Sequence, residues 1–497
     1  MTPEIVLGPP GTGKTTRLLQ MVGVELEAGT SPSEIGYVSF TRKAAQEAVS
    51  RACEKFGKDR REFRHFRTIH SACYNSLGMV PGDVFQGNRL LEFGAWIGYR
   101  VSRHVYLESD YQQHPADRAL FMENLARVRQ IPLRQQYEMD HDDLQWNFVE
   151  YMASGLTKYK ITNGLIDYTD MLQNYIDWVP PPRIKKLFVD EGQDLSSLQW
   201  SVVRKMATHC DRMVVAGDDD QAIYDWAGAD VDHFVNMSGE VSTLNQSWRC
   251  PRSIQRLSAE IIGRVDNRRD KSWSPRDNDG LVERVSSMDQ VDTSGEDVLI
   301  LARNARYAEQ FMRLLREAGV VYEWRGSTSV SKNLLQAVQD WEQLRQGKQM
   351  TVERVRAVYD FMQVGSGVRR GFKSLPDMSD TDEVTLSDLR EHGGLMRFDI
   401  WHEALERMPN EERVYMLRAR QQGERLTARP RVRVSTIHSA KGGESEHVVL
   451  LTDMAWKTSE EFFRRPESEH RVWYVGVTRA RDRLTIVEPH SSRYYDV

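Results

Sequence analysis

A glycine-rich segment near the start of the chain has the residues and spacing of a phosphate-binding loop. Residues 8–15 fit the pattern GxxxxGK[ST] in full, after a short apolar run and before residues of helical periodicity. Glycines let backbone N–H groups face phosphate oxygens, and the start of the following helix adds positive potential. The pattern predicts that Lys14 reaches the β- and γ-phosphates of a nucleotide and that the Thr15 hydroxyl binds Mg²⁺. The predicted nucleotide-binding residues here are Gly8, Pro9, Pro10, Gly11, Thr12, Gly13, Lys14, Thr15 and Thr16.

Two carboxylates follow a second apolar run, Leu187–Val189. A carboxylate at a strand end can hold Mg²⁺ while its neighbour orients or deprotonates the attacking water. We therefore predict that Asp190 binds the metal and that Glu191 is the general base. A solvated acidic turn is the alternative, and the complete phosphate loop elsewhere in the chain favours the catalytic interpretation.

Three aspartates and a glutamine follow the next apolar run, at Asp218–Gln221. Clustered carboxylates cannot all face an anionic phosphate, so some of them must be solvated or paired with basic groups. Gln221 is neutral and could sense the γ-phosphate without repulsion. Its spacing alone leaves that role open.

The elements that must position these residues form two α/β sets. Short apolar runs at 5–7, 37–40, 187–189 and 213–216 alternate with helical patterns, which indicates a parallel sheet covered by helices. A second set of runs lies at 298–301, 432–435, 448–451 and 484–487. The predicted first domain is formed by residues 1–72 and 185–250, with a helical insertion at 73–184. The second is formed by 251–345 and 430–497, with a helical insertion at 346–429.

Composition excludes several classes of protein. The 497 residues are 40% hydrophobic and 28% charged, without an apolar run of about 18 residues, so we expect a soluble chain and no membrane span. No secretory leader is expected. The net charge of −5 excludes a histone-like basic surface but permits a local basic channel. Four widely spaced cysteines predict free thiols in a reducing, intracellular compartment and no zinc site.

Read in order, these segments resemble the motifs of superfamily 1 helicases of the UvrD/Rep/PcrA type. Asp190–Asp194 resembles the DExQD motif, and Gly217–Ala229 is similar to motif III. The other matching segments are 40–45 (motif Ia), 68–71 (motif Ib), 247–249 (the Asn-Tyr-Arg segment), 436–444 (motif V) and 474–481 (motif VI). The resemblance covers about two thirds of the chain and implies two RecA-like parallel-sheet domains.

The resemblance assigns roles that spacing leaves open. It implies that Arg249 and Arg479 are arginine fingers that reach the γ-phosphate from the second domain, neutralising charge in the transferring group. It also implies that Gln221 is the γ-phosphate sensor, that Trp248 stacks on adenine and that Glu444 lies near the ribose.

The resemblance also implies a path for single-stranded DNA. Aromatic side chains can stack on any base, and Thr or His can hold phosphate or sugar without reading sequence. Core packing or structural hydrogen bonding is the alternative for an isolated tryptophan or histidine. The implied DNA-binding residues are Phe40, Thr41, His70, Tyr224, Trp226, Thr436 and His438.

The implied activity is an ATP- and Mg²⁺-dependent helicase or translocase that moves 3′→5′ on single-stranded DNA. We expect a cytoplasmic or nucleoid-associated monomer that binds strands and duplex junctions, in a bacterial or phage-infected cell. Alternatives are a DNA-dependent ATPase that remodels complexes without unwinding, an RNA substrate, or an inactive scaffold. The sequence departs from the family at Ala227 and Gly443, which predicts weaker binding of DNA or weaker coupling. It also lacks an upstream glutamine motif, which predicts less strict selection of ATP over other nucleotides.

Overall fold

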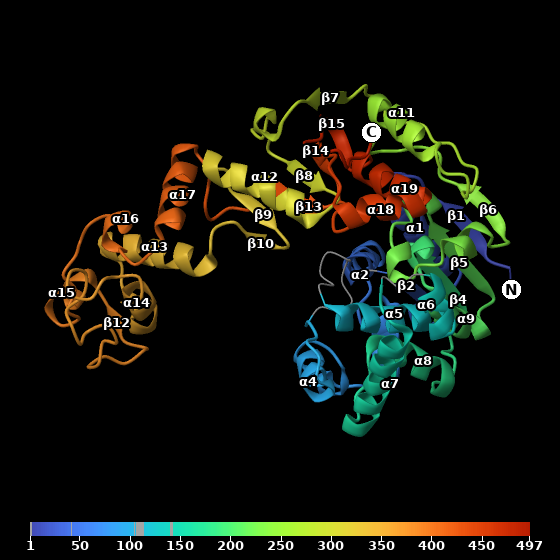
Figure 1. Cartoon of the computed structure of the whole chain (residues 1–497), viewed down its shortest axis with the longest axis horizontal. Coiled ribbons are helices and arrows are strands. Elements are labelled where there is room, and N and C mark those ends of the chain that lie inside the picture. The colour runs from blue at the N-terminus through green and yellow to red at the C-terminus, as the bar shows by residue number, and fades with distance from the viewer. Residues whose placement is uncertain (1, 41, 104, 106–113, 140–142) are drawn as a thin grey trace. The chain divides into compact units, whose positions relative to one another are not determined.

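The structure is a computed structural model that describes residues 2–40, 42–103, 105, 114–139 and 143–497. The chain packs into two compact units, whose elements are labelled in Figure 1. Unit 1 contains Met1–Val282, Met454–Arg483 and Tyr495–Val497. Unit 2 contains Glu283–Asp453 and Leu484–Tyr494.

Unit 1 is built on a six-stranded sheet in the order β3-β2-β4-β5-β1-β6. Every neighbouring pair of strands is parallel, which confirms the α/β class predicted from the alternating runs. Parallel strands need crossover connections, which the helices between them supply. The strands are β1 (Glu4–Leu7), β2 (Ile35–Ser39), β3 (Phe66–Thr68), β4 (Lys186–Asp190), β5 (Arg212–Gly217) and β6 (Glu240–Thr243).

The strands β1, β2, β4 and β5 are largely buried on both faces of this sheet, which explains why they read as apolar runs. Alternate residues of β1 point to opposite faces, so Val6 joins one core cluster while Ile5 and Leu7 join the other. Helices α1 (Lys14–Glu27) and α2 (Arg42–Phe56) cover the first face. Helices α3 (Ile69–Ser76), α8 (Tyr168–Trp178) and α9 (Ser197–Met206) cover the second.

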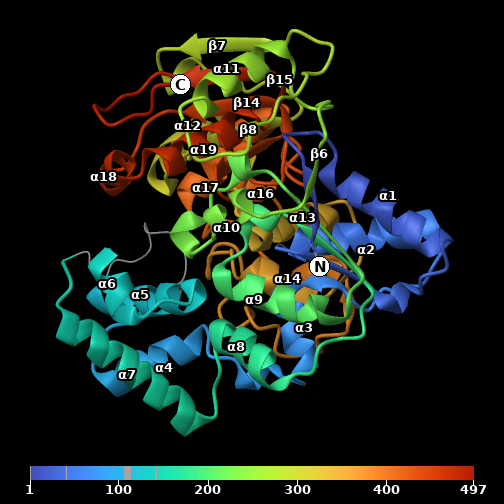
Figure 2. The same ribbon diagram turned by 90° about the vertical axis from the view of Figure 1, so that its right-hand side faces the viewer.

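A helical insertion lies between β3 and β4 and has a hydrophobic core of its own, drawn from residues 85–165. Figure 2 shows its helices gathered together. They are α4 (Asn88–Ile97), α5 (Pro115–Arg129), α6 (Leu133–Met139) and α7 (Trp146–Asn163). The remaining helices of unit 1 are α10 (Val231–Val235), α11 (Arg252–Ile262), α18 (Trp456–Arg464) and α19 (Pro466–Val477).

Unit 2 carries the larger part of a seven-stranded sheet in the order β10-β9-β13-β8-β14-β15-β7. Its central strands are parallel, and only the short β10 is antiparallel to its neighbour among the pairings described here. The strands are β7 (Leu281–Val285), β8 (Val298–Ala302), β9 (Tyr322–Trp324), β10 (Ser327–Thr328), β13 (Val432–Thr436), β14 (Ser445–Leu451) and β15 (Ala480–Val487). Helix α12 (Ala305–Ala318) packs on this sheet.

A second, smaller insertion in unit 2 surrounds a separate core that includes Trp341 and Trp401. This core begins at Val330, so it also takes in α13. Its elements are α13 (Lys332–Arg345), β11 (Met350–Thr351), α14 (Val352–Tyr359), β12 (Glu383–Val384), α15 (Leu386–Glu391), α16 (Trp401–Ala404) and α17 (Asn410–Gln421).

Short 3₁₀ helices complete the fold, and two of them carry predicted site residues. These two are η4 (Gly192–Asp194) and η6 (Asp219–Gln221). The others are η1 (Pro32–Glu34), η2 (Pro81–Asp83), η5 (Ala207–His209), η7 (Asp225–Ala227) and η8 (Met288–Gln290). All four cysteines are free thiols. In the described ranges, no helix has the length and apolar character needed to cross a membrane.

Two segments of the predicted second domain pack with unit 1. Residues 251–282 and 454–483, expected in the second domain, pack with unit 1. The physical reason is a set of contacts to motif III. The buried guanidinium of Arg471 in α19 donates to the Asp219 carbonyl at 3.0 Å, and the Arg269 N–H donates to the Asp219 carboxylate at 2.8 Å.

Candidate nucleotide site and strand-binding surface

The predicted phosphate loop lies between the end of β1 and the start of α1. Its conformation depends on glycine, because Gly11 and Gly13 have φ angles of 72° and 84°, in the left-handed region that disfavours side chains. A Cβ atom on Gly8 would clash with the Lys14 side chain, and one on Gly11 would clash with Arg249. The loop therefore needs glycine both for its backbone angles and for the close approach of Lys14 and Arg249.

Lys14 is held at the base of this loop. Its Nζ donates to the Gly8 carbonyl at 2.8 Å and lies 4.0 Å from the Glu191 carboxylate. The lysine side chain is largely buried, with 11% exposure. A fixed ammonium beside a glycine-rich loop at the start of a helix is an arrangement that attracts phosphate.

Asp190 is buried at the end of β4 and receives two hydroxyl hydrogen bonds on the same oxygen. Thr15 Oγ1 donates to Oδ2 at 3.0 Å, and the buried Tyr37 hydroxyl donates to it at 2.6 Å. Burial, and then the neighbouring Glu191, raise the pKa of Asp190 to about 6. The structure thus brings together Thr15 and Asp190, the two residues predicted to bind the metal.

Glu191 occupies a strained backbone position beside Asp190. Its φ angle is 56°, in the left-handed region, which costs about 1–3 kcal/mol for a residue with a side chain. Gln193 holds the carboxylate by donating Nε2 to Glu191 Oε2 at 2.6 Å. The other end of that amide accepts the Asp218 N–H at 3.0 Å. The glutamine therefore links the predicted base to motif III.

Gln221 lies at the centre of a hydrogen-bond chain that joins motif III to motif VI. Its Nε2 donates to Asp218 at 2.6 Å, and its Oε1 accepts from the Arg479 guanidinium at 2.9 Å. Arg479 is 1% exposed and also donates to the Val475 carbonyl at 3.0 Å. Both arginine candidates lie in unit 1, where Arg249 donates to the Thr478 carbonyl at 3.3 Å.

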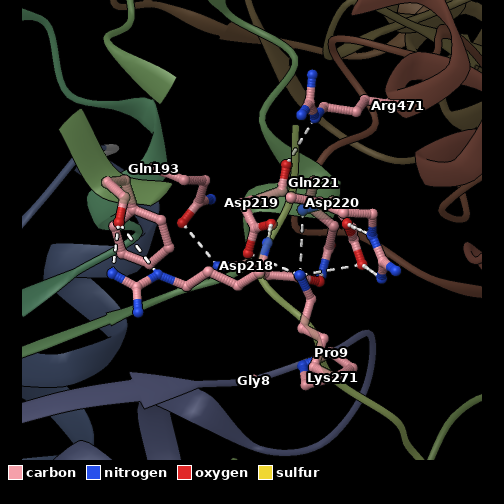
Figure 3. Close-up of polar contacts among 12 residues, drawn as sticks. Gly8, Pro9, Gln193, Asp218, Asp219, Asp220, Gln221, Lys271 and Arg471 are labelled. Atoms are coloured by element: carbon pink, nitrogen blue, oxygen red, sulfur yellow. Dashed lines mark hydrogen bonds and ion pairs between the residues drawn. The ribbon is translucent and has the colours of Figure 1, made fainter. Parts of the chain in front are cut away.

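The three aspartates of motif III surround a lysine that the sequence patterns do not reveal (Figure 3). The Lys271 side chain is fully buried, and its Nζ lies 2.6 Å from Asp219, 3.1 Å from Asp220 and 3.4 Å from Asp218. Arg268 forms a bidentate ion pair with Asp220, in which Nε donates to Oδ1 at 2.8 Å and Nη2 donates to Oδ2 at 2.6 Å. Burial, despite the attraction of Lys271, raises the pKa of Asp218 to about 6.

Residues 247–249 dock against the phosphate loop. Ser247 Oγ donates to the Pro10 carbonyl at 2.7 Å, and the Trp248 N–H donates to the Gly11 carbonyl at 2.9 Å. The Trp248 side chain is 71% exposed beside the loop. An exposed indole next to a phosphate loop can stack on a planar base.

The residues present fit a nucleotide with Mg²⁺. The glycine-rich loop and Lys14 suit phosphates, and the Thr15 hydroxyl with the Asp190 carboxylate offers the oxygen ligands that Mg²⁺ prefers. Mg²⁺ is commonly held by one or two such groups together with substrate phosphates. In keeping with this, no group of three or more His, Cys, Asp or Glu in the described ranges is arranged to hold a metal on its own.

Three predicted strand-binding side chains of unit 1 lie in aromatic pairs. The ring centroids of Phe40 and Tyr224 are 5.1 Å apart. Trp226 is stacked on Phe121 of α5, with ring centroids 6.3 Å apart. Each of the three predicted residues is partly exposed. Trp226 therefore has one face packed on the insertion, which makes it both a platform candidate and part of an aromatic contact.

His70 lies in α3, with its ring 5.9 Å from Tyr168. Burial, and then the charge of Arg42, lower the pKa of His70 to about 4. The imidazole is therefore neutral near pH 7, so it can contact a strand by hydrogen bonding or stacking but not by charge.

The other predicted strand and ribose residues lie in unit 2 or outside the described ranges. Thr436 caps the turn after β13 by accepting the Ser439 N–H at 3.2 Å, and both Thr436 and His438 are 4% exposed. Glu444 is exposed before β14, where its carbonyl accepts from Arg433. Thr41 lies outside the described residues.

Comparison with known families agrees with this geometry. Residues 1–242 match the UvrD/REP helicase N-terminal domain, and residues 328–490 match the UvrD-like helicase C-terminal domain. The chain belongs to the UvrD/Rep helicase family. The N-terminal match spans the phosphate loop, the Asp190 carboxylate and motif III, and the C-terminal match includes Arg479.

The curated relatives are distant and longer. ATP-dependent DNA helicase PcrA of Staphylococcus aureus (strain Mu50) is 23% identical over 328 residues, which is 62% of this chain and 44% of that protein. PcrA of Staphylococcus epidermidis is 21% identical over 63% of this chain and 45% of its own length. The chain thus spans less than half the length of these relatives. An arterivirus helicase structure aligns over 99% of this chain and 60% of its own, at 12% identity and a TM-score of 0.37.

Several residues of the site carry no sequence signal. Tyr37 reads as an ordinary core residue of β2, yet it holds Asp190. Lys271 and Arg268 lie about fifty positions from the aspartates they pair with. The clustering of Asp218–Asp220 indicated that some of these carboxylates have basic partners or are solvated. It did not identify the partner residues.

Proposed function

We propose that this protein is an ATP- and Mg²⁺-dependent motor that moves along single-stranded DNA and unwinds duplexes, with 3′→5′ travel. The observation that carries the proposal is the continuous set of contacts from Lys14 and Asp190 to Gln221 and Arg479. These contacts join the lysine that we expect to bind phosphate, the carboxylate that we expect to bind the metal and a guanidinium within unit 1. The family membership supports the same activity.

In this proposal the residues of unit 1 divide the work of phosphoryl transfer. Lys14 binds the terminal phosphates, and the Thr15 hydroxyl with Asp190 holds Mg²⁺, which would neutralise charge on the phosphates. Glu191 accepts a proton from the attacking water and is oriented by Gln193. Arg249 and Arg479 donate to the oxygens on which charge accumulates.

Gln221 couples the nucleotide to the strand in this proposal. It lies three residues before Tyr224 and five before Trp226, so a shift of its amide on phosphate loss moves the strand-binding side chains of the same segment. Phe40 and Trp226 would stack on bases, while His70, Thr41, Thr436 and His438 would contact the sugar-phosphate backbone. Glu444 and Trp248 would contact the nucleoside.

The remaining assignments rest on the family resemblance and on composition. We assign the protein to the cytoplasm, acting as a monomer on strands and duplex junctions. Its two predicted RecA-like domains would comprise residues 1–72 with 185–250, and 251–345 with 430–497. The helical insertions of the first and second domains, which correspond to domains 1B and 2B of the family, would be residues 73–184 and 346–429.

Tailed duplexes test the proposal. A labelled duplex with a 3′ single-stranded tail and one with a 5′ tail are each incubated with protein, Mg²⁺ and ATP, and the released strand is measured. The proposal predicts ATP-dependent release from the 3′-tailed duplex and none from the 5′-tailed duplex. ATP hydrolysis without release from either duplex would indicate instead a DNA-dependent ATPase that remodels complexes.

A further inference from the structure

An arginine-rich cavity of unit 1 lies outside the nucleotide site. It has a volume of about 1060 Å³ and is bounded by α2, β3, α3, α8 and the segment that joins α2 to β3. We call this segment, residues 57–65, the arginine loop. His70 lines the cavity, whereas Lys14, Asp190, Glu191 and Gln221 do not. The cavity therefore adjoins a predicted strand-binding residue and is not lined by these four predicted nucleotide-site residues.

The arginine loop has a defined conformation. Phe63 is 2% exposed and packs edge-on against Phe66 with ring centroids 4.8 Å apart, which anchors the loop to the sheet. Asp59 accepts the Arg61 N–H at 2.8 Å, and Glu62 accepts from both the Asp59 N–H and Lys58. The two acidic residues of the loop are thus occupied within the loop itself.

The cavity wall carries an excess of positive charge. One carboxylate, Asp59, lines it together with five arginines, none of which forms an ion pair with any residue in the described part of the chain. These are Arg42, Arg60, Arg61, Arg64 and Arg67. The first four are exposed, and Arg67 is partly exposed. Their field reaches neighbouring groups, because burial and the charges of Arg64 and Arg67 lower the pKa of His65 to about 4.

The cavity also offers groups that suit an extended polynucleotide. The partly exposed Tyr74 and the exposed Tyr168 line it, and Tyr168 is fixed by donating its hydroxyl to Gln86 at 2.7 Å. Ser71 adds a hydroxyl beside His70. Unpaired guanidinium groups next to tyrosine rings are the combination with which proteins grip single strands without reading their sequence.

We propose that this cavity binds the phosphates of a single-stranded polynucleotide and extends the strand path beyond His70. The inference rests on the proposed function, since it requires a strand at His70. The arginine loop supplies charge to consecutive phosphates, and Tyr74 and Tyr168 supply surfaces for the bases between them. The occupant is identified by charge complementarity and by continuity with the strand-binding surface.

The test compares salt dependence of strand binding in two charge-matched variants. The pocket variant is Arg60→Gln/Arg61→Gln/Arg64→Gln. The control variant, Arg183→Gln/Arg204→Gln/Arg256→Gln, removes three exposed arginines of the same unit that do not line the cavity. Binding of labelled oligothymidylate, short and long, is followed by fluorescence anisotropy over a salt series. Thermal unfolding midpoints confirm that each variant is folded.

Each phosphate contact on a single strand contributes about 0.7 to the slope of log K against log salt concentration. We expect the pocket variant to reduce the magnitude of that slope by about 2 with the long oligonucleotide, since three contacts are lost. The reduction should be smaller with the short oligonucleotide. We expect the control variant to leave the slope unchanged. The lysine version, Arg60→Lys/Arg61→Lys/Arg64→Lys, should restore most of the slope, because it restores the charge.

Each other outcome has a distinct meaning. If wild-type protein binds strands and the pocket variant retains its full slope, the cavity is not part of the path and the inference fails alone. If both triple variants lower the slope equally, the effect is general charge and the inference is also overturned. If wild-type protein binds no oligonucleotide, the proposed function fails and the inference falls with it.

Discussion

Replacing Lys271 by Met should both destabilise unit 1 and slow nucleotide turnover. The substitution keeps an unbranched side chain but removes the buried cation that lies within 3.4 Å of Asp218, Asp219 and Asp220. Removing one partner of a buried ion pair costs about 3–5 kcal/mol, because the other charge stays buried without compensation. At about 2 °C per kcal/mol for a large domain, the thermal midpoint should fall by about 6–10 °C.

The pH dependence of this loss has a defined sign. Burial raises the pKa of Asp218 to about 6, above its ordinary value of 3.8, so the folded state favours the protonated carboxyl. The stability that protonation contributes is complete below about pH 4 and is lost as the pH rises through about 6. The deficit of the Lys271→Met variant should therefore be largest above pH 7. It should shrink as the pH is lowered through 6, because a protonated Asp218 needs no counter-ion.

Two further variants separate charge from packing. Asp219→Asn placed in the Lys271→Met background should recover part of the stability, since it removes one of the uncompensated charges. Lys160→Met is the matched control, because Lys160 is a nearly buried lysine that pairs with Asp167 and Asp170 at 2.6 Å in the helical insertion. It should lower stability without lowering ATP turnover of the folded protein.

Stability is measured by differential scanning fluorimetry from pH 5 to pH 8 (chosen to bracket the Asp218 pKa of about 6). Turnover is measured by steady-state ATP hydrolysis at a temperature where each variant is folded. In Lys271→Met, turnover should fall more than nucleotide binding, since Asp218 no longer fixes the Gln221 amide. Unfolding of Lys271→Met at the wild-type temperature would contradict these expectations, and so would a loss of stability that grows toward acidic pH.

Three other substitutions probe separate parts of the site. Glu191→Gln should keep nucleotide binding, measured by fluorescent-nucleotide titration, and lose about 10²-fold or more in turnover because the general base is gone; near-normal turnover would remove that assignment. Tyr37→Phe removes the 2.6 Å hydrogen bond to Asp190, so it should raise the Mg²⁺ concentration needed for half-maximal turnover several-fold. An unchanged Mg²⁺ titration would show that the hydroxyl does not position the carboxylate. Trp226→Ala should weaken strand binding by about 1–3 kcal/mol and reduce strand displacement more than ATP hydrolysis, whereas unchanged displacement would exclude it as a base platform.

Local spacing predicted the parts of the site that lie at strand ends. The loop at residues 8–15 and the carboxylates at 190–191 each follow a buried strand, and parallel strands β1 and β4 deliver both to the same edge of the sheet. The contact between Thr15 and Asp190 could therefore be expected from position alone. The α/β class could be expected for the same reason, since alternating strands and helices leave few other arrangements.

The rest of the site depends on tertiary packing that no local pattern records. Tyr37 is indistinguishable from any buried strand residue until its hydroxyl is seen to donate to Asp190. Phe121 covers one face of Trp226 from an insertion about a hundred residues earlier. The arginine candidates were expected to lie in the second predicted domain, and they pack in unit 1, where Arg471 of α19 and Arg269 donate hydrogen bonds to Asp219 of motif III.

The proposed function requires that one site in unit 1 hydrolyses ATP in response to a bound strand. The most direct test is the rate of ATP hydrolysis by wild-type protein and by Glu191→Gln as oligothymidylate is titrated in. We expect a saturable rise in the wild-type rate and a flat, low rate for Glu191→Gln. A wild-type rate that does not respond to the strand, or a rise that Glu191→Gln shares, would contradict it.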